Sequence, residues 1–200
     1  MPRIPRAVVV DHPLHVVQRG INRSDCFFAE SDYLTYLDYL RKFAETFGCS
    51  VHAYCLMTNH VHLLVTPLSA EASAGMMREL GRRYTCYFNR RYLRTGTLWE
   101  GRFRSCLVET ARYVIACYRY IELNPVRPGM ANEPATYPWS SHSANIGKRT
   151  DPLVTPHAQY LALGLEPQTR YRAYAELVRE ALQPSEITAI RKAISGGLKL

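Results

Sequence analysis

The 200-residue sequence lacks the features that assign a chain to several classes of protein. It has no apolar run long enough to cross a bilayer, and no signal-peptide core follows its basic N-terminus. Its six cysteines form no CxxC pair, which argues against a zinc ribbon and a disulfide framework. We therefore expect a globular cytoplasmic protein with reduced thiols and no membrane partner.

Lysine is missing from one long stretch in which arginine is abundant. Between Arg78 and Arg127, eleven arginines stand against four glutamates, a net charge of +7 in a chain whose formal net charge is +8. The planar guanidinium suits fork-like contacts with phosphate and stacking on bases. A single arginine in such a stretch is usually part of a solvated helix face. The block as a whole predicts a polyanionic partner, which we interpret as nucleic acid.

The hydrophobic pattern predicts alternating strands and helices over most of the chain. Its periods indicate strand, helix, strand, strand, helix, strand and helix in turn, over residues 12–20, 31–47, 49–57, 60–67, 70–92, 101–109 and 110–124. Ser31 is the expected N-cap of the first helix, and Gly48 its end. The order β-α-β-β-α-β predicts a ferredoxin-like or RRM-like plait, an α+β fold with helices on one face of an antiparallel sheet.

The composition becomes loop-like after residue 129, which we take as a boundary. Residues 1–129 would hold the plait and its last helix, and residues 130–200 a loop-rich and helical C-terminal appendage. Helices are expected near 168–183 and 186–195, and the first has an apolar stripe that must be buried. Packing on the back of the plait is the simplest interpretation. A gate over the binding site, or an extension of its groove, are the alternatives.

The segment NHVHLLV places two histidines one residue apart in an otherwise apolar strand. Side chains alternate along a strand, so His60 and His62 point to one face and Val61 to the other. We expect helices to cover the Val61 face, which leaves both imidazoles on the open face, near enough to hold one metal ion. A pair of half-exposed structural histidines is the alternative.

The last helix of this unit carries three tyrosines in the segment RYVIACYRYIELNPV. Residues four apart share a helix face, so Tyr118 lies with Glu122, and Tyr120 lies with Asn124. Each pair combines a nucleophile with an oxygen ligand, and the pattern does not choose between them. A third interpretation is that all the tyrosines pack or hydrogen-bond at the surface.

Four motifs in the chain are similar to those of one enzyme family. HPLHVVQRGINR, YCLMTNHVHLLV, LWEGRFRS and YIELNPVR resemble the REP-associated tyrosine transposases, a branch of the single-tyrosine HUH transposase superfamily. The resemblance implies that Tyr120 is the nucleophile. It also implies that His60, His62 and Asn124 bind a divalent metal ion.

The implied activity is that of a transposase, a metal-dependent endonuclease and strand transferase for single-stranded DNA. A tyrosine phenol, with a pKa of about 10, is a poor nucleophile at neutral pH, and a metal ion that polarises the phosphate would offset this. Imidazole and amide ligands suit Mg²⁺ or Mn²⁺. Attack would leave a 5′-phosphotyrosine link.

The implied partner is single-stranded DNA that bears a hairpin of repetitive palindromic sequence. An open sheet face with nearby arginines suits splayed bases and backbone. The expected contacts are Arg19, Arg23, Arg82, Arg83, Arg102 and Arg104. The resemblance also implies a bacterial protein associated with the nucleoid, which acts as a monomer or a homodimer.

Two rival functions are left open by the sequence. A non-catalytic nucleic-acid-binding module with the same fold would lack a ligand or the nucleophile, and neither is missing. A metal hydrolase would use His60 and His62 with an acid such as Glu122, and would form no covalent intermediate.

Overall fold

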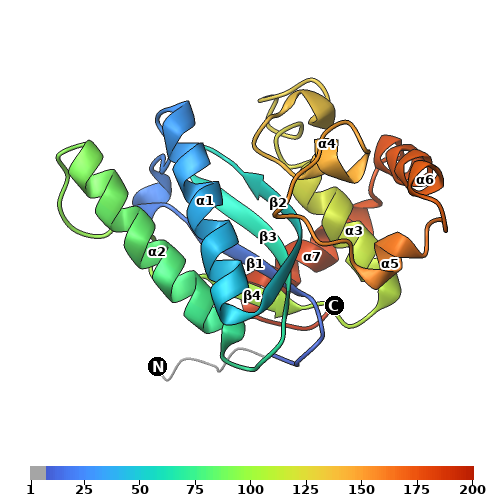
Figure 1. Cartoon of the computed structure of the whole chain (residues 1–200), viewed down its shortest axis with the longest axis horizontal. Coiled ribbons are helices and arrows are strands. Elements are labelled where there is room, and N and C mark those ends of the chain that lie inside the picture. The colour runs from blue at the N-terminus through green and yellow to red at the C-terminus, as the bar shows by residue number, and fades with distance from the viewer. Residues whose placement is uncertain (1–7) are drawn as a thin grey trace.

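A four-stranded antiparallel sheet lies at the centre of the protein (Figure 1). The computed structural model describes residues 8–200. The sheet order is β2-β3-β1-β4, and adjacent strands are antiparallel throughout. The elements of this unit are β1 (Leu14–Arg19), the 3-10 turn η1 (Ile21–Arg23), α1 (Glu30–Phe47), β2 (Cys49–Leu56), β3 (His60–Pro67), α2 (Ala72–Arg91) and β4 (Arg104–Leu107). The predicted ferredoxin-like plait is confirmed.

Helix α1 begins one residue before Ser31, so the prediction that Ser31 caps it is wrong. Asp32 satisfies the free N–H groups instead, because its Oδ2 accepts from the backbone N–H of Phe28 at 2.8 Å and of Ala29 at 3.0 Å. A carboxylate accepts such bonds more strongly than a hydroxyl does. Gly48, in the left-handed conformation, ends the helix as predicted.

Helices α1 and α2 cover one face of the sheet and bury its apolar side chains. Val61, Leu63 and Val65 of β3 belong to this core, as expected from the alternation along the strand. Tyr84 and Phe88 of α2 are fully buried against it. The face that carries Val61 is therefore the covered one.

The second face of the sheet was expected to be open, and the structure corrects this. Helix α3 (Ala111–Glu122) packs on β2 and β3, and α7 (Pro184–Gly196) packs on β4 and β1 (Figure 1). The physical reason is that this face of the sheet and one side of α3 are both apolar. Cys117 and Ile121 of α3 and Leu64 of β3 are fully buried together in a second core. Within residues 8–200, no helix is long and apolar enough to span a membrane.

Residues 130–200 pack around α3. They form the 3-10 turn η2 (Pro134–Thr136), α4 (His142–Asn145), α5 (Ala158–Leu161), α6 (Pro167–Arg179) and α7. Figure 1 shows α4, α5 and α6 gathered beside α3. The chain then returns to the sheet, where the N–H of Leu200 bonds to the carbonyl of Leu107 at 2.9 Å. Apolar side chains of residues 130–200 thus belong to the same core as those of α3 and of the adjoining sheet face.

A buried carboxylate at the end of α3 ties this segment to the plait. Glu122 is fully buried and accepts four hydrogen bonds, from Ser141 Oγ at 2.5 Å, Asn145 Nδ2 at 2.7 Å, Tyr174 Oη at 2.7 Å and His142 Nδ1 at 3.0 Å. A carboxylate has about four lone-pair sites, so its acceptor capacity is used. The network fixes α3 relative to α4 and α6.

We expect Tyr174→Phe to lower the free energy of unfolding by about 1.5–3 kcal/mol, the usual cost of losing a hydrogen bond to a charged group. The phenol of Tyr174 is fully buried against Glu122, so water cannot replace it. Urea unfolding followed by circular dichroism measures the change. Tyr171→Phe, one turn earlier on α6, is the matched control and should change it little. Equal effects of both variants would contradict this role for the Glu122 network.

Candidate functional site

Strands β1 and β3 bring three histidines together on the face that α3 partly covers. His60 lies opposite Arg19 across the ladder, and His62 lies opposite Val17. His15 precedes Val17 by two residues on β1, so it lies on the same face as His62 and diagonal to it. His15 Nε2 and His62 Nδ1 share a hydrogen bond of 2.9 Å, and the ring centroids of His60 and His62 are 5.0 Å apart.

The three imidazoles are held neutral at pH 7. Burial lowers the pKa of His15 to about 3 and of His60 to about 4, and it lowers the pKa of His62 well below its ordinary value. The Nδ1 atom of His60 lies 2.6 Å from Oδ1 of Asn59, and that of His62 bonds to His15. Each predicted ligand therefore keeps Nε2 for a metal, in the neutral form that metals bind.

Tyr120 is the tyrosine of α3 that faces these histidines. Its ring centroid lies 5.7 Å from that of His15 and 5.9 Å from that of His62, edge-on in both cases. The guanidinium of Arg127 lies over the same ring, 4.3 Å from its centroid, and donates to the Tyr120 carbonyl at 3.0 Å. The ring is thus held between imidazoles and a guanidinium, with 8% of the residue exposed.

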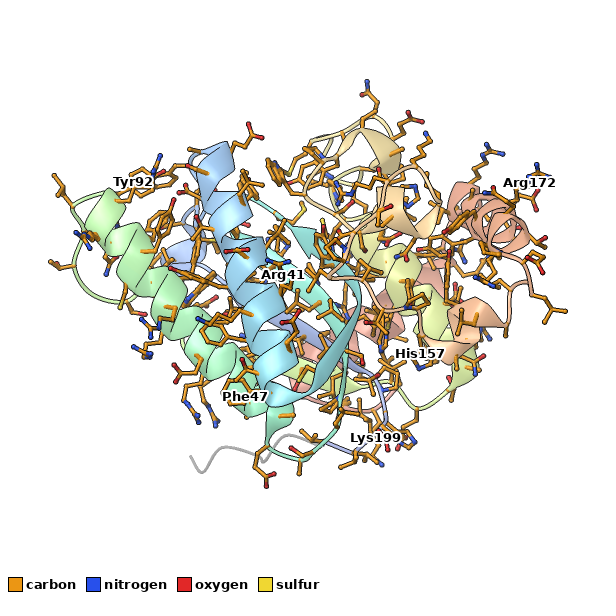
Figure 2. The ribbon with its side chains drawn as sticks, in the orientation of Figure 1. Arg41, Phe47, Tyr92, His157, Arg172 and Lys199 are labelled. Atoms are coloured by element: carbon orange, nitrogen blue, oxygen red, sulfur yellow. The ribbon has the colours of Figure 1, made fainter. Side chains whose placement is uncertain are left out.

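Tyr118 points away from the histidines into the C-terminal segment. It stacks on Tyr160 with ring centroids 5.8 Å apart, and its hydroxyl accepts from the backbone N–H of His157 at 3.2 Å (Figure 2 labels His157). Burial raises the pKa of the Tyr118 phenol and so disfavours the phenolate. Its helical partner Glu122 is saturated by the four donors described above. Of the two pairs left open by the sequence, this one lies in the C-terminal segment, away from the histidines.

Asn124 lies just beyond the end of α3, which stops two residues short of the predicted end. The residue before a proline avoids helical geometry, and Pro125 follows here. The backbone N–H of Asn124 bonds to the carbonyl of Ile121 at 3.2 Å. Its side-chain Nδ2 is buried and has no hydrogen-bond partner within residues 8–200. An unsatisfied buried N–H group is uncommon, and it calls for an acceptor such as a phosphate oxygen and not for a cation.

The donor set fits a divalent cation. His60 and His62 retain Nε2, and Asn124, the third predicted ligand, has an amide oxygen to offer. Within the described part of the chain, no cluster of three or more histidine, cysteine, aspartate or glutamate side chains is arranged for a metal. The third ligand that the sequence predicts is the amide of Asn124. Two imidazoles and an amide oxygen suit Mn²⁺ somewhat better than Mg²⁺.

A comparison of sequences assigns the chain to a family. A model of the family described as IS200-like transposases matches residues 8–124, more than half of the chain. The chain belongs to this family. Membership makes the protein a transposase by class, an enzyme of DNA cleavage and recombination. Comparison with the curated proteins finds no match.

Two solved structures are similar to this transposase. A REP-associated tyrosine transposase bound to a REP hairpin aligns with 80% of this chain and 93% of its own, with a TM-score of 0.65 and 16% identity. A candidate transposase from Deinococcus radiodurans aligns with 57% of this chain and 91% of its own, with a TM-score of 0.42 and 21% identity. The first of these shows that the fold is shared.

The transposase carries its predicted DNA-contact arginines on more than one side of the sheet. Arg104 lies on the same face of the sheet as His62, because both pair with Val17 of β1. Arg19 lies on this face too, because it pairs with His60. Arg23 is exposed in η1 beside the β2–β3 turn, where its carbonyl accepts from Asn59. Two of the predicted arginines, Arg19 and Arg104, thus lie on the site face, and Arg23 lies beside the β2–β3 turn.

The other predicted arginines lie beyond the site face. Arg82 and Arg83 are exposed on α2, which packs on the opposite face of the sheet, and Arg82 pairs with Glu79 at 2.8 Å. Arg102 precedes β4 and, together with Arg78 of α2, lines a cavity of about 330 Å³ at the sheet edge. The structure does not bring these residues together with the histidines.

Two residues of the site were missed by sequence reasoning. His15 lies in the motif HPLHVVQRG, where alternation along β1 would have placed it on the His62 face once the strand register was known. Arg127 was counted only as part of the basic block. No local pattern indicates that it folds back over Tyr120, because the contact depends on the turn after α3.

Proposed function

We propose that this transposase cleaves and rejoins single-stranded DNA through a covalent bond between Tyr120 and a 5′-phosphate. The observation that carries the proposal is the packing of the Tyr120 ring against His62, at 5.9 Å between centroids. A nucleophile and a candidate metal ligand therefore adjoin one another. Tyr118, the competing nucleophile, is buried on the other side of α3.

The residues of the site have separable roles in this reaction. His60 and His62, through Nε2, and Asn124, through its amide oxygen, would hold a Mg²⁺ or Mn²⁺ ion. When bound, such an ion polarises the scissile phosphate and stabilises the charge that develops on its oxygens. The Tyr120 oxygen attacks phosphorus while the bond to the 3′ oxygen breaks. Arg127 holds the tyrosine ring in place for this attack.

The products follow from the bonds that form and break. One DNA segment leaves with a free 3′-hydroxyl, and the other stays on Tyr120 through its 5′-phosphate. The phosphodiester bond is exchanged for a phosphotyrosine bond, so attack by a 3′-hydroxyl can rejoin the DNA without ATP. This accounts for a strand transferase as well as a nuclease.

We propose hairpin-bearing single-stranded DNA as the substrate, of the kind found in repetitive palindromic sequences. The solved relative with the same fold is bound to a REP hairpin, which supports this assignment. Arg19 and Arg104 on the site face would contact its backbone, as would Arg23 beside the β2–β3 turn and Arg102 at the sheet edge. Arg82 and Arg83 would be reached only by a strand that passes around that edge.

Incubation of the protein with end-labelled hairpin DNA and Mn²⁺ tests this function. On a denaturing gel, a label at the 3′ end should migrate with the protein, and a label at the 5′ end should appear on a shorter free strand. That free strand should be extended by a polymerase, because it ends in a 3′-hydroxyl. Two free fragments and no adduct would identify a hydrolase instead.

We expect binding of the hairpin DNA to weaken steeply with salt. Engagement of about 4–6 phosphates predicts a slope of log affinity against log salt of roughly −3 to −4, at about −0.7 per contact for single strands. Arg104→Ala should make the slope shallower by about 0.7, whereas Arg82→Ala should leave it unchanged. Fluorescence anisotropy at several salt concentrations measures both. A flat dependence, or tighter binding to plain duplex, would contradict the proposal.

A further inference from the structure

The third histidine of the site, His15, has no role in the proposed reaction as described so far. It is fully buried on β1, and it is a polar residue where an apolar side chain would pack without cost. Its Nε2 bonds to His62, but its Nδ1 has no hydrogen-bond partner within residues 8–200. A buried polar atom without a partner is destabilising, so packing alone would favour leucine here.

The position of His15 is fixed by two contacts. Its ring centroid lies 5.2 Å from that of His62 and 5.7 Å from that of Tyr120, the candidate ligand and the candidate nucleophile. Strand pairing with β3 and β4 holds its backbone, through Leu64 and Cys106. One buried imidazole therefore contacts both functional groups of the site and is itself immobilised.

The His15–His62 hydrogen bond decides which nitrogen of His62 carries a proton. The two bonded nitrogens are 2.9 Å apart, so one donates and the other accepts, and a single proton lies between them. If His62 donates through Nδ1, its Nε2 is a free lone pair. If His15 donates instead, the proton of His62 must lie on Nε2, and the ring cannot ligate through that atom.

We propose that His15 is a positioning residue that holds His62 in the tautomer able to bind a metal. In this state His15 accepts through Nε2 and keeps its own proton on Nδ1. Outer hydrogen-bond partners of metal-bound histidines commonly act in this way, by fixing ring orientation and tautomer. The inference rests on the proposed function, because it takes His62 as a ligand.

The first test compares two variants of His15 by their affinity for Mn²⁺ alone. His15→Leu fills the space but cannot accept a hydrogen bond, whereas His15→Gln can place an amide oxygen near the position of Nε2. Electron paramagnetic resonance of free Mn²⁺ gives the affinity without any cleavage. We expect His15→Leu to bind about 10–100-fold more weakly than the wild type, and His15→Gln to recover most of that loss.

A merely structural role would give a different pattern. Unchanged affinity in His15→Leu, or an equal loss in both variants, would overturn the inference. His62→Ala is measured in parallel to separate it from the proposed function. If wild type and His62→Ala bind Mn²⁺ equally, His62 is not a ligand and both proposals fail. If only His62→Ala is impaired, the role of His15 alone is wrong.

A second test needs no substitution, and so does not depend on folding of the variants. Nitrogen-15 NMR of the histidine rings, in wild-type protein saturated with diamagnetic Mg²⁺, reports the tautomer directly. We expect His62 and His15 each to carry a proton on Nδ1. A proton on Nε2 of His62 under these conditions would overturn the inference.

Discussion

Tyr120→Phe is expected to abolish the covalent protein–DNA adduct and to leave hairpin binding nearly unchanged. The substitution removes the attacking oxygen but keeps the ring that packs against His62 and lies under Arg127. Loss of a covalent nucleophile leaves no alternative route to the adduct, so its rate of formation should fall by at least about 10³-fold. Denaturing gels with 3′-labelled DNA measure the adduct, and anisotropy measures binding.

Tyr118→Phe is the matched control for this result. It removes the same atom from the same helix, two residues away, where the hydroxyl only accepts a hydrogen bond from the backbone of His157. Adduct formation should persist in this variant at close to the wild-type rate. If the adduct persists in Tyr120→Phe and disappears in Tyr118→Phe, the nucleophile has been assigned to the wrong tyrosine.

Replacement of His62 by alanine is expected to have the second largest effect. It removes one of the two proposed imidazole ligands, and the described residues offer no cluster of three or more acidic, histidine or cysteine side chains in their place, so both metal affinity and cleavage should collapse. Stabilisation of transition-state charge by a metal amounts to several kcal/mol, which corresponds to a loss in rate of about 10³-fold or more. His60→Ala should behave alike, and a chelator should have the same effect on the wild type.

His12→Ala serves as the control for the histidine variants. His12 is exposed before β1, and within residues 8–200 its ring bonds only to the nearby carbonyl of Val10, so cleavage should be unaffected. Melting temperatures show whether any loss of activity comes from unfolding. Full cleavage in excess chelator would remove the metal from the mechanism and return His60 and His62 to a structural role.

The element order could be predicted from the sequence because it depends on local periodicity. Alternation in β3 and the three-to-four spacing in α2 are set by which residues face the core, and both appear as expected. Element ends depended on contacts that are distant in sequence. Asp32 caps the start of α1, and its carboxylate also accepts hydrogen bonds from the hydroxyls of Tyr87 and Tyr92, 55 and 60 residues away. The local sequence around Ser31 does not indicate these distant partners.

The candidate site could be predicted only in part, because it too depends on contacts that are distant in sequence. The i,i+4 rule placed Tyr118 with Glu122 and Tyr120 with Asn124 but could not tell which pair faces the sheet. In the structure Glu122 faces the C-terminal segment, where the hydroxyl of Tyr174, 52 residues later, is one of its four donors. The preference for Tyr120 came from the family resemblance. His15 became visible only through the register of β1 on β3.

Mass spectrometry of the trapped adduct tests the central claim most directly. Trypsin cuts after Arg119, so Tyr118 and Tyr120 fall on different peptides, and nuclease treatment leaves a short nucleotide on whichever tyrosine attacked. The account predicts the added mass on the peptide that begins at Tyr120, joined through a 5′-phosphate. An added mass on the peptide that ends at Arg119, or cleaved DNA with no modified peptide, would contradict it.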